Sequence, residues 1–135
     1  MISNKLKKLF LLSLLLIYIH GVEEILTGFA YKDSFMVFGA NLFKTATENF
    51  YWVFHLIWWV AVPVLFFLFK QTKLIFLLMS IYGSVFVIEI HHLAKAVILG
   101  SYYPGMITAV FYPVLGYFYW KELIKNRKGA KQIGR

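Results

Sequence analysis

The chain has 135 residues, of which 61% are hydrophobic and only 15% are charged. Soluble domains carry about a quarter charged residues, so this composition excludes an ordinary soluble protein and indicates an integral membrane protein. The net charge is +8, but the basic residues gather near the chain ends and in one short turn, which argues against nucleic-acid binding and favours contact with anionic lipids. The absence of cysteine excludes disulfides and thiolate metal sites.

Four stretches are long and apolar enough for a helix of about 20 residues to cross a bilayer. They run over about 9–29, 48–69, 74–99 and 103–124, and a basic tail follows at 125–135. Short connections make consecutive helices antiparallel neighbours. We therefore expect one all-α domain over 1–135, a polytopic membrane protein folded as a four-transmembrane-helix up-down bundle.

The first apolar stretch follows three lysines, as a signal peptide does. No small-residue cleavage site comes after it, and His20 to Glu24 stands there instead. We therefore interpret this stretch as a spanning helix that is retained.

Basic residues flank the cytoplasmic ends of membrane helices. With the N-terminus inside, eleven of the 14 Lys and Arg residues lie on the cytoplasmic side. Only Lys32 and Lys44 lie outside, and Lys95 falls within the third span. The sequence thus predicts both termini in the cytoplasm, the chain lying in the cytoplasmic membrane with anionic lipids at the inner face.

Three histidines share a predicted depth in the membrane. His20 travels outward on the first span, His55 inward on the second, and His92 outward on the third. At 1.5 Å per residue, all three imidazoles fall roughly 10–15 Å below the outer interface. Since ionisable groups at this depth are costly, they indicate a functional site.

Carboxylates accompany these histidines at helical spacing. His20 with Glu23 and Glu24 is an i, i+3, i+4 set, and Glu89 with His92 is a Glu-x-x-His pair. Di-metal carboxylate bundles use Glu and Glu-x-x-His on facing helices. The pattern predicts a metal centre.

The second span adds Glu48 and His55, seven residues apart on one face. His91 points about 100° away from His92 and is therefore not expected to share its centre. Lys95 is placed to neutralise a buried glutamate without any metal. A metal-free proton network and purely structural contacts between helices thus remain alternatives.

The segment His20-Gly21-Val22-Glu23-Glu24 resembles the signature of the HXXEE-motif family of small bacterial membrane proteins. The resemblance extends to a His late in the third span, His92, and to a Tyr-x-Pro-Gly-x-x-Thr stretch. That stretch is formed here by Tyr102, Pro104, Gly105 and Thr108. The resemblance implies four helices and supports these site residues, and it implies no activity.

Pro104 suits the first turn of a helix, where its missing N–H is not needed. The alternative is that this stretch places Tyr102 or Tyr103 and Thr108 over the polar cluster. Lys95, Tyr102 and Thr108 are therefore candidate pocket residues beside the metal ligands.

The leading hypothesis is a metal-dependent membrane enzyme that acts on a lipid or quinone-like molecule. A nitrogen and oxygen ligand set suits Fe, Mn or Zn, and Glu23 is a ligand or the general base. The expected ligands are His20, Glu24, Glu48, His55, Glu89 and His92. A proton- or cation-coupled transporter, which would need a homodimer, and a non-catalytic helper subunit are the alternatives.

Overall fold

The computed structural model describes residues 2–69 and 74–133. These residues form helices joined by short turns: α1 (Asn4–Thr27), α2 (Phe29–Lys32), α3 (Ser34–Leu42), α4 (Thr47–Leu56), the π-helical turn η1 (Ile57–Ala61), α5 (Val62–Phe69), α6 (Leu74–Gly83), α7 (Val85–Ile88), α8 (Ile90–Leu99), α9 (Met106–Ala109) and α10 (Phe111–Ile133). The turn predicted at 70–73 and Arg135 lie outside the described residues.

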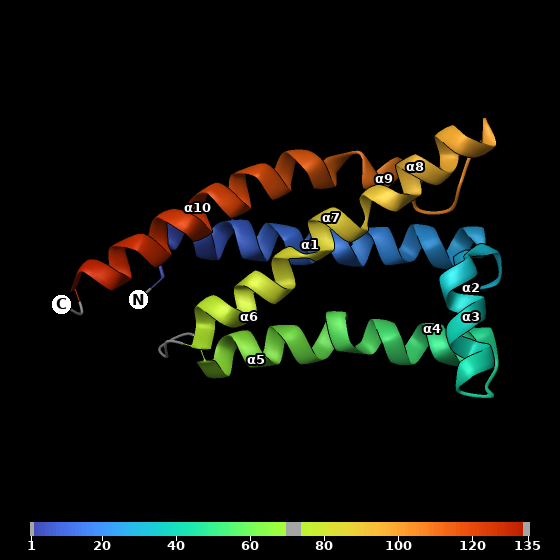
Figure 1. Cartoon of the computed structure of the whole chain (residues 1–135), viewed down its shortest axis with the longest axis horizontal. Coiled ribbons are helices and arrows are strands. Elements are labelled where there is room, and N and C mark those ends of the chain that lie inside the picture. The colour runs from blue at the N-terminus through green and yellow to red at the C-terminus, as the bar shows by residue number, and fades with distance from the viewer. Residues whose placement is uncertain (1, 70–73, 134–135) are drawn as a thin grey trace.

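Most of these elements run lengthwise, whereas α2 and α3 lie across one end (Figure 1). The chain goes out along α1, back along α4, η1 and α5, out again along α6 to α8, and back along α9 and α10. Both termini therefore lie at the end opposite α3 (Figure 1).

Within residues 2–69 and 74–133, three helical stretches are long and apolar enough to cross a membrane, namely Asn4–Thr27, Thr47–Phe69 and Leu74–Leu99. The prediction of four such helices is therefore wrong in number. The fourth segment breaks into a turn at 102–105, the short α9 and then α10. Lys121 and Glu122 follow the first ten residues of α10, and ten helical residues extend only about 15 Å, half the hydrocarbon thickness.

The segment expected to be a long connection forms α2 and α3. Asp33 caps the N-terminus of α3, since its Oδ1 accepts from the backbone N–H of Phe35 at 2.9 Å and of Met36 at 3.2 Å. Phe38 and Leu42 leave their side chains exposed on α3. An apolar helix across the end of a membrane bundle suits the interface between headgroups and acyl chains.

The π-helical turn η1 has a local cause. Pro63 lacks the N–H that would bond to the carbonyl of Trp59 four residues earlier, and its ring crowds that carbonyl. The freed carbonyl of Trp59 accepts from the hydroxyl of Tyr18 at 2.5 Å, which ties α1 to this stretch. The irregular turn begins two residues after His55.

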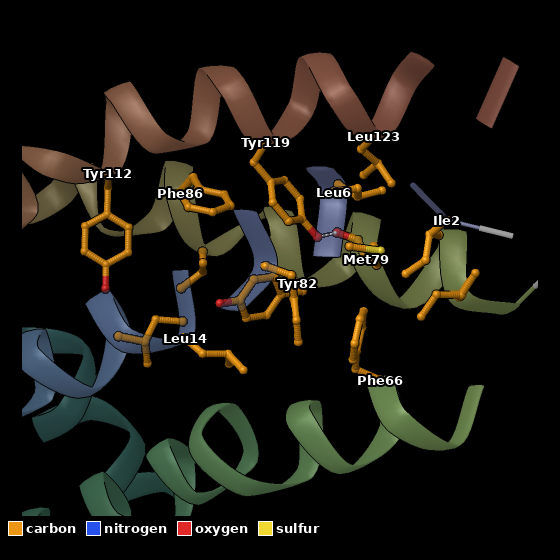
Figure 2. Packing of buried hydrophobic residues seen from close by; sticks show 14 residues of the cluster. Ile2, Leu6, Leu14, Phe66, Met79, Tyr82, Phe86, Tyr112, Tyr119 and Leu123 are labelled. Atoms are coloured by element: carbon orange, nitrogen blue, oxygen red, sulfur yellow. Dashed lines mark hydrogen bonds between the residues drawn. The ribbon is translucent and has the colours of Figure 1, made fainter. Parts of the chain in front are cut away.

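The main apolar core lies in the half of the molecule that holds the termini (Figure 2). Phe10 of α1 stacks on Phe66 of α5, with ring centroids 4.0 Å apart, and meets the edge of Tyr82 on α6 at 4.9 Å. The Tyr82 hydroxyl lies 2.8 Å from Ser13 Oγ. Because lipid is as apolar as this core, close packing and such hydrogen bonds hold the helices together.

Phe10→Ala should destabilise the protein because it removes a ring that joins three helices. We expect a loss of about 3 kcal/mol in the free energy of unfolding, the cost of truncating a buried phenylalanine. Leu11→Ala is the matched control, since Leu11 is 51% exposed on the same helix, and it should change stability by less than about 0.5 kcal/mol. Unfolding by SDS in mixed micelles measures both, and equal losses would contradict the described core.

Candidate metal centre

Two histidines and two glutamates meet between α1 and α8. His20 and Glu24 come from α1, Glu89 stands between α7 and α8, and His92 comes from α8. His20 Nε2 lies 3.0 Å from Glu89 Oε2 and 3.5 Å from Glu24 Oε1. His92 Nε2 lies 3.0 Å from Glu89 Oε2 and 3.3 Å from Glu24 Oε1. The two Nε2 atoms are 3.2 Å apart, so four donor atoms surround one small volume.

These distances match those between ligands of a single ion. Two ligand atoms each about 2.1 Å from one metal lie roughly 3.0 Å apart at a right angle and roughly 3.4 Å apart at the tetrahedral angle. The five nitrogen–nitrogen and nitrogen–oxygen separations given above fall between 3.0 and 3.5 Å. The four donor atoms all lie within 4.8 Å of one another, so the group could hold a metal ion.

The four side chains are largely buried. His92 is 0% exposed, Glu24 2% and His20 4%, and the Glu89 side chain is 16% exposed. A buried carboxylate needs a counter-charge and hydrogen bonds, because isolated burial of a charge costs many kcal/mol. Two carboxylates in one buried group therefore require positive charge between or beside them.

The ring of His92 is held by the turn before α9. Its Nδ1 donates to the backbone carbonyl of Pro104. A carbonyl only accepts, so Nδ1 carries the hydrogen, and neutral His92 turns the lone pair of Nε2 toward the group. Pro104 thus stands before α9 rather than in its first turn, and its carbonyl orients His92.

The ring of His20 is held through a hydroxyl. Its Nδ1 lies 2.6 Å from Thr108 Oγ1, which itself donates to Glu23 Oε2 at 2.6 Å. Because a carboxylate only accepts, the single hydroxyl hydrogen goes to Glu23, and the oxygen accepts from His20 Nδ1–H. Neutral His20 therefore also directs the lone pair of Nε2 at the group.

Glu23 faces the start of α9 and not the group of four. Its oxygens accept from the hydroxyl of Tyr102 at 2.7 Å and from the backbone N–H of Ile107 and Thr108 at 3.0 and 2.9 Å. With the Thr108 hydroxyl, these donors occupy both carboxylate oxygens. Glu23 caps α9 from a different helix and so fixes the hydroxyl that orients His20.

Gly105 lets this turn close over the two imidazoles. Its φ of +83° is left-handed, and a Cβ there would stand 2.6 Å from His92 Nδ1 and 2.7 Å from His20 Cε1. Backbone conformation and packing therefore both require glycine. Tyr102, Pro104, Gly105 and Thr108 together form a clamp on the two histidines.

The second oxygen of Glu24 faces α4. Glu24 Oε2 lies 3.0 Å from His55 Nε2 and accepts from the Tyr51 hydroxyl at 3.1 Å. His55 Nδ1 donates to the backbone carbonyl of Tyr51 at 2.8 Å. All three histidines predicted to share a depth thus lie around the Glu24 carboxylate, with His55 beside the group of four.

Glu48, the other ligand expected on the second span, lies elsewhere. It is exposed in the first turn of α4, and its Oε2 accepts from the Tyr31 hydroxyl at 3.0 Å. Lys95 neutralises neither Glu24 nor Glu89: within the part of the chain that the structure describes, it makes no ion pair.

A second polar group, centred on Asp33, was not predicted. Asp33 Oδ2 accepts from the Tyr103 hydroxyl at 2.8 Å and lies 3.6 Å from His91 Nε2. Burial raises the pKa of Asp33, but these partners and the N-terminus of α3 outweigh it and lower the pKa to about 2. The only sequence signal was the turn-forming Asp33-Ser34 pair, which marks a cap but not its partners.

A cavity of about 650 Å³ adjoins the cluster. One wall carries Glu24, His55, Glu89 and His92, and Lys95 is also in its lining. The remaining walls are largely apolar, with Phe29, Phe35, Met36, Phe54, Trp58, Val87 and Ile88. Its volume is that of pockets that bury small organic ligands.

Comparison with protein families matches residues 11–119 to the family described as "Protein of unknown function with HXXEE motif". No curated protein and no solved structure matches the chain.

Gly105→Ala should damage the clamp beyond the cost of its backbone conformation. The matched control is Gly100→Ala, because Gly100 also has a positive φ, +62°, but nothing within 4 Å of a built Cβ. We expect Gly100→Ala to lose about 1 kcal/mol from strain and Gly105→Ala to lose about 2 kcal/mol more from overpacking. Melting in detergent compares them, and similar losses would show that the turn does not press on the imidazoles.

Proposed function

We propose that this chain, which belongs to the HXXEE family of proteins of unknown function, binds one transition-metal ion through His20, Glu24, Glu89 and His92. We further propose that it is a metal-dependent membrane enzyme acting on a lipid or quinone-like molecule. The observation that carries the proposal is the fixed orientation of the two imidazoles.

Each Nδ1–H is committed to an oxygen outside the group, at Pro104 for His92 and at Thr108 for His20. In their neutral forms the rings present two nitrogen lone pairs, 3.2 Å apart, beside two carboxylates. Four acceptors around one point repel each other unless a cation or added protons lie among them, and a metal ion is the cation that we propose. Metal-binding histidines characteristically use the other ring nitrogen in this way.

The donor atoms restrict the choice of metal. Two imidazole nitrogens with two carboxylate oxygens suit Fe, Mn or Zn, whereas softer metals prefer the thiolates that this chain lacks. Such an ion supplies Lewis-acid or redox chemistry when bound. The chain itself contributes a dry surrounding, fixed ring orientations and His55 with Tyr51 beside Glu24.

The adjoining cavity supports an enzyme rather than a closed structural site. A metal bound among the four residues would lie beside a space of about 650 Å³ with apolar walls. Phe35, Val87 and Ile88 line that space and are 52%, 66% and 47% exposed, so it opens on the side of the bundle. An apolar molecule dissolved in the bilayer can therefore reach the cluster directly.

Removing a ligand should abolish metal binding while the protein still folds. Polar contacts inside membranes average about 0.6 kcal/mol, so the helices assemble without them. We expect purified parent protein to hold about one ion per chain, and His20→Ala or Glu89→Gln to hold none at near-normal yield. Thr108→Val, which removes the oxygen that orients His20, should weaken metal affinity about 10- to 100-fold. Elemental analysis and metal titration measure this.

His91→Ala is the control, since His91 faces Asp33 outside the group and should retain the metal. Variants that vanish from the membrane would show that the cluster serves as contact between helices. Folded parent protein without a stoichiometric metal would favour the proton network and a proton- or cation-coupled transporter.

We also propose that both termini lie in the cytoplasm, which requires α9 and α10 together to make a return crossing although they are not among the three apolar spans. The excess of Lys and Arg near the two ends supports this, as does the return of α9 and α10 to the end where α1 begins (Figure 1). The basic end of α10 would then meet the anionic inner face of the membrane.

The absence of native cysteine makes labelling of single cysteines a clean test of this orientation. Thr45→Cys, in the turn after α3, should react with an impermeant maleimide in intact cells. Lys128→Cys, on α10, should react only after the cells are opened. Labelling of both positions from the same side would contradict the proposed orientation.

A further inference from the structure

Among the described residues, the wall of the cavity holds a charged side chain without a partner, that of Lys95. Asp33 is surrounded by two backbone N–H groups, Tyr103 and His91. Glu24 and Glu89 belong to the cluster, where imidazoles face them. Lys95 is half-buried in the lining and, within the described residues, has no ion pair or hydrogen bond. An ammonium beside apolar walls favours an anion as its partner.

We infer that this cavity binds an acidic amphiphile with a single alkyl chain, its anionic head on Lys95 and its chain along the apolar walls. One chain fits because a space of about 650 Å³ is that of a drug-sized ligand, and a two-chain lipid is larger. The head is a carboxylate or a phosphate, which an ammonium binds alike.

The order of residues along α7 and α8 determines which part of a bound amphiphile lies beside the cluster. Lys95 lies three residues beyond His92 and six beyond Glu89, so roughly 4.5 and 9 Å further along the helix axis. Val87 lies on the other side of the cluster, roughly 12 Å from Lys95. A molecule that spans from Lys95 toward Val87 therefore presents the part of its chain nearest the head to the cluster. This inference rests on the proposed function for the claim that the bound molecule is the substrate; binding itself needs only the cavity and Lys95.

The test is equilibrium binding of radiolabelled dodecanoate to the full chain in nanodiscs of zwitterionic lipid. Unlabelled dodecyl phosphate, dodecanol and dodecyltrimethylammonium are the competitors. We expect dodecyl phosphate to compete, dodecanol to bind at least about tenfold more weakly because it lacks the charge-assisted bond, and the cation not to compete. Stronger binding of dodecanoate than of dodecyl phosphate assigns a carboxylate head, and the reverse assigns a phosphate.

Lys95→Gln should lower the affinity for dodecanoate about tenfold and leave that for dodecanol unchanged, while Lys95→Arg should restore it. Lys44→Gln is the matched control, because Lys44 is an exposed cation in the turn after α3 and outside the cavity lining. Equal affinity for dodecanoate and dodecanol, or no effect of Lys95→Gln, would overturn the inference.

His20→Ala separates this inference from the proposed metal function, since His20 does not line the cavity. The variant should lose metal and keep dodecanoate binding within about threefold. If the parent protein holds no metal but binds dodecanoate through Lys95, the inference is upheld and the proposed metal centre is removed. If the parent protein holds metal but does not bind dodecanoate, the metal centre is upheld and the inference is overturned. Binding lost on metal removal but not in Lys95→Gln would place the head on the ion and overturn the inference.

Discussion

The arrangement of this protein depends on two imidazole nitrogens that face each other at 3.2 Å between two buried carboxylates. In neutral rings these nitrogens carry lone pairs, because the opposite ring nitrogens are bound to Pro104 and Thr108. The group is therefore unfavourable unless positive charge lies within it. A single divalent ion would meet all four donor atoms at once, and a proton on each Nε2 is the metal-free alternative.

The surrounding chain holds these donors in place from several elements. α1 supplies His20 and Glu24, and it also supplies Glu23, which caps α9 and thereby orients His20. The turn at Gly105 closes over both rings. The larger apolar core lies toward the termini (Figure 2). A smaller one, formed by Phe29, Ala30, Met36, Tyr51 and Tyr103, packs beside the cluster, so hydrogen bonds and packing together position the polar end. A centre built this way keeps its geometry while leaving one side open to the cavity.

Helical spacing and shared depth pointed to His20, Glu24, Glu89 and His92, and the structure brings these four residues together. Their role as metal ligands stays a prediction. Glu48 satisfied the same spacing, yet it lies in the first turn of α4 and faces Tyr31, because spacing fixes a face of a helix but not what that face meets. The sequence could not predict the clamp at Gly105, since the backbone carbonyl of Pro104 that holds His92 has no sequence signature. The fourth span was overcounted because its apolar residues run on through the turn before α9 and the break at Val110, and Lys121 and Glu122 end the apolar part of α10.

X-ray absorption spectroscopy of the metal-loaded protein tests the central claim most directly, because it reads the ligands of the ion itself. The account predicts one Fe, Mn or Zn per chain with nitrogen and oxygen ligands at about 2.0–2.2 Å, an imidazole scattering pattern and no sulfur. His92→Ala, which removes one of the four ligands, should hold no ion. A protein that cannot be loaded with a stoichiometric ion, or an ion whose imidazole scattering is unchanged in His92→Ala, would contradict it.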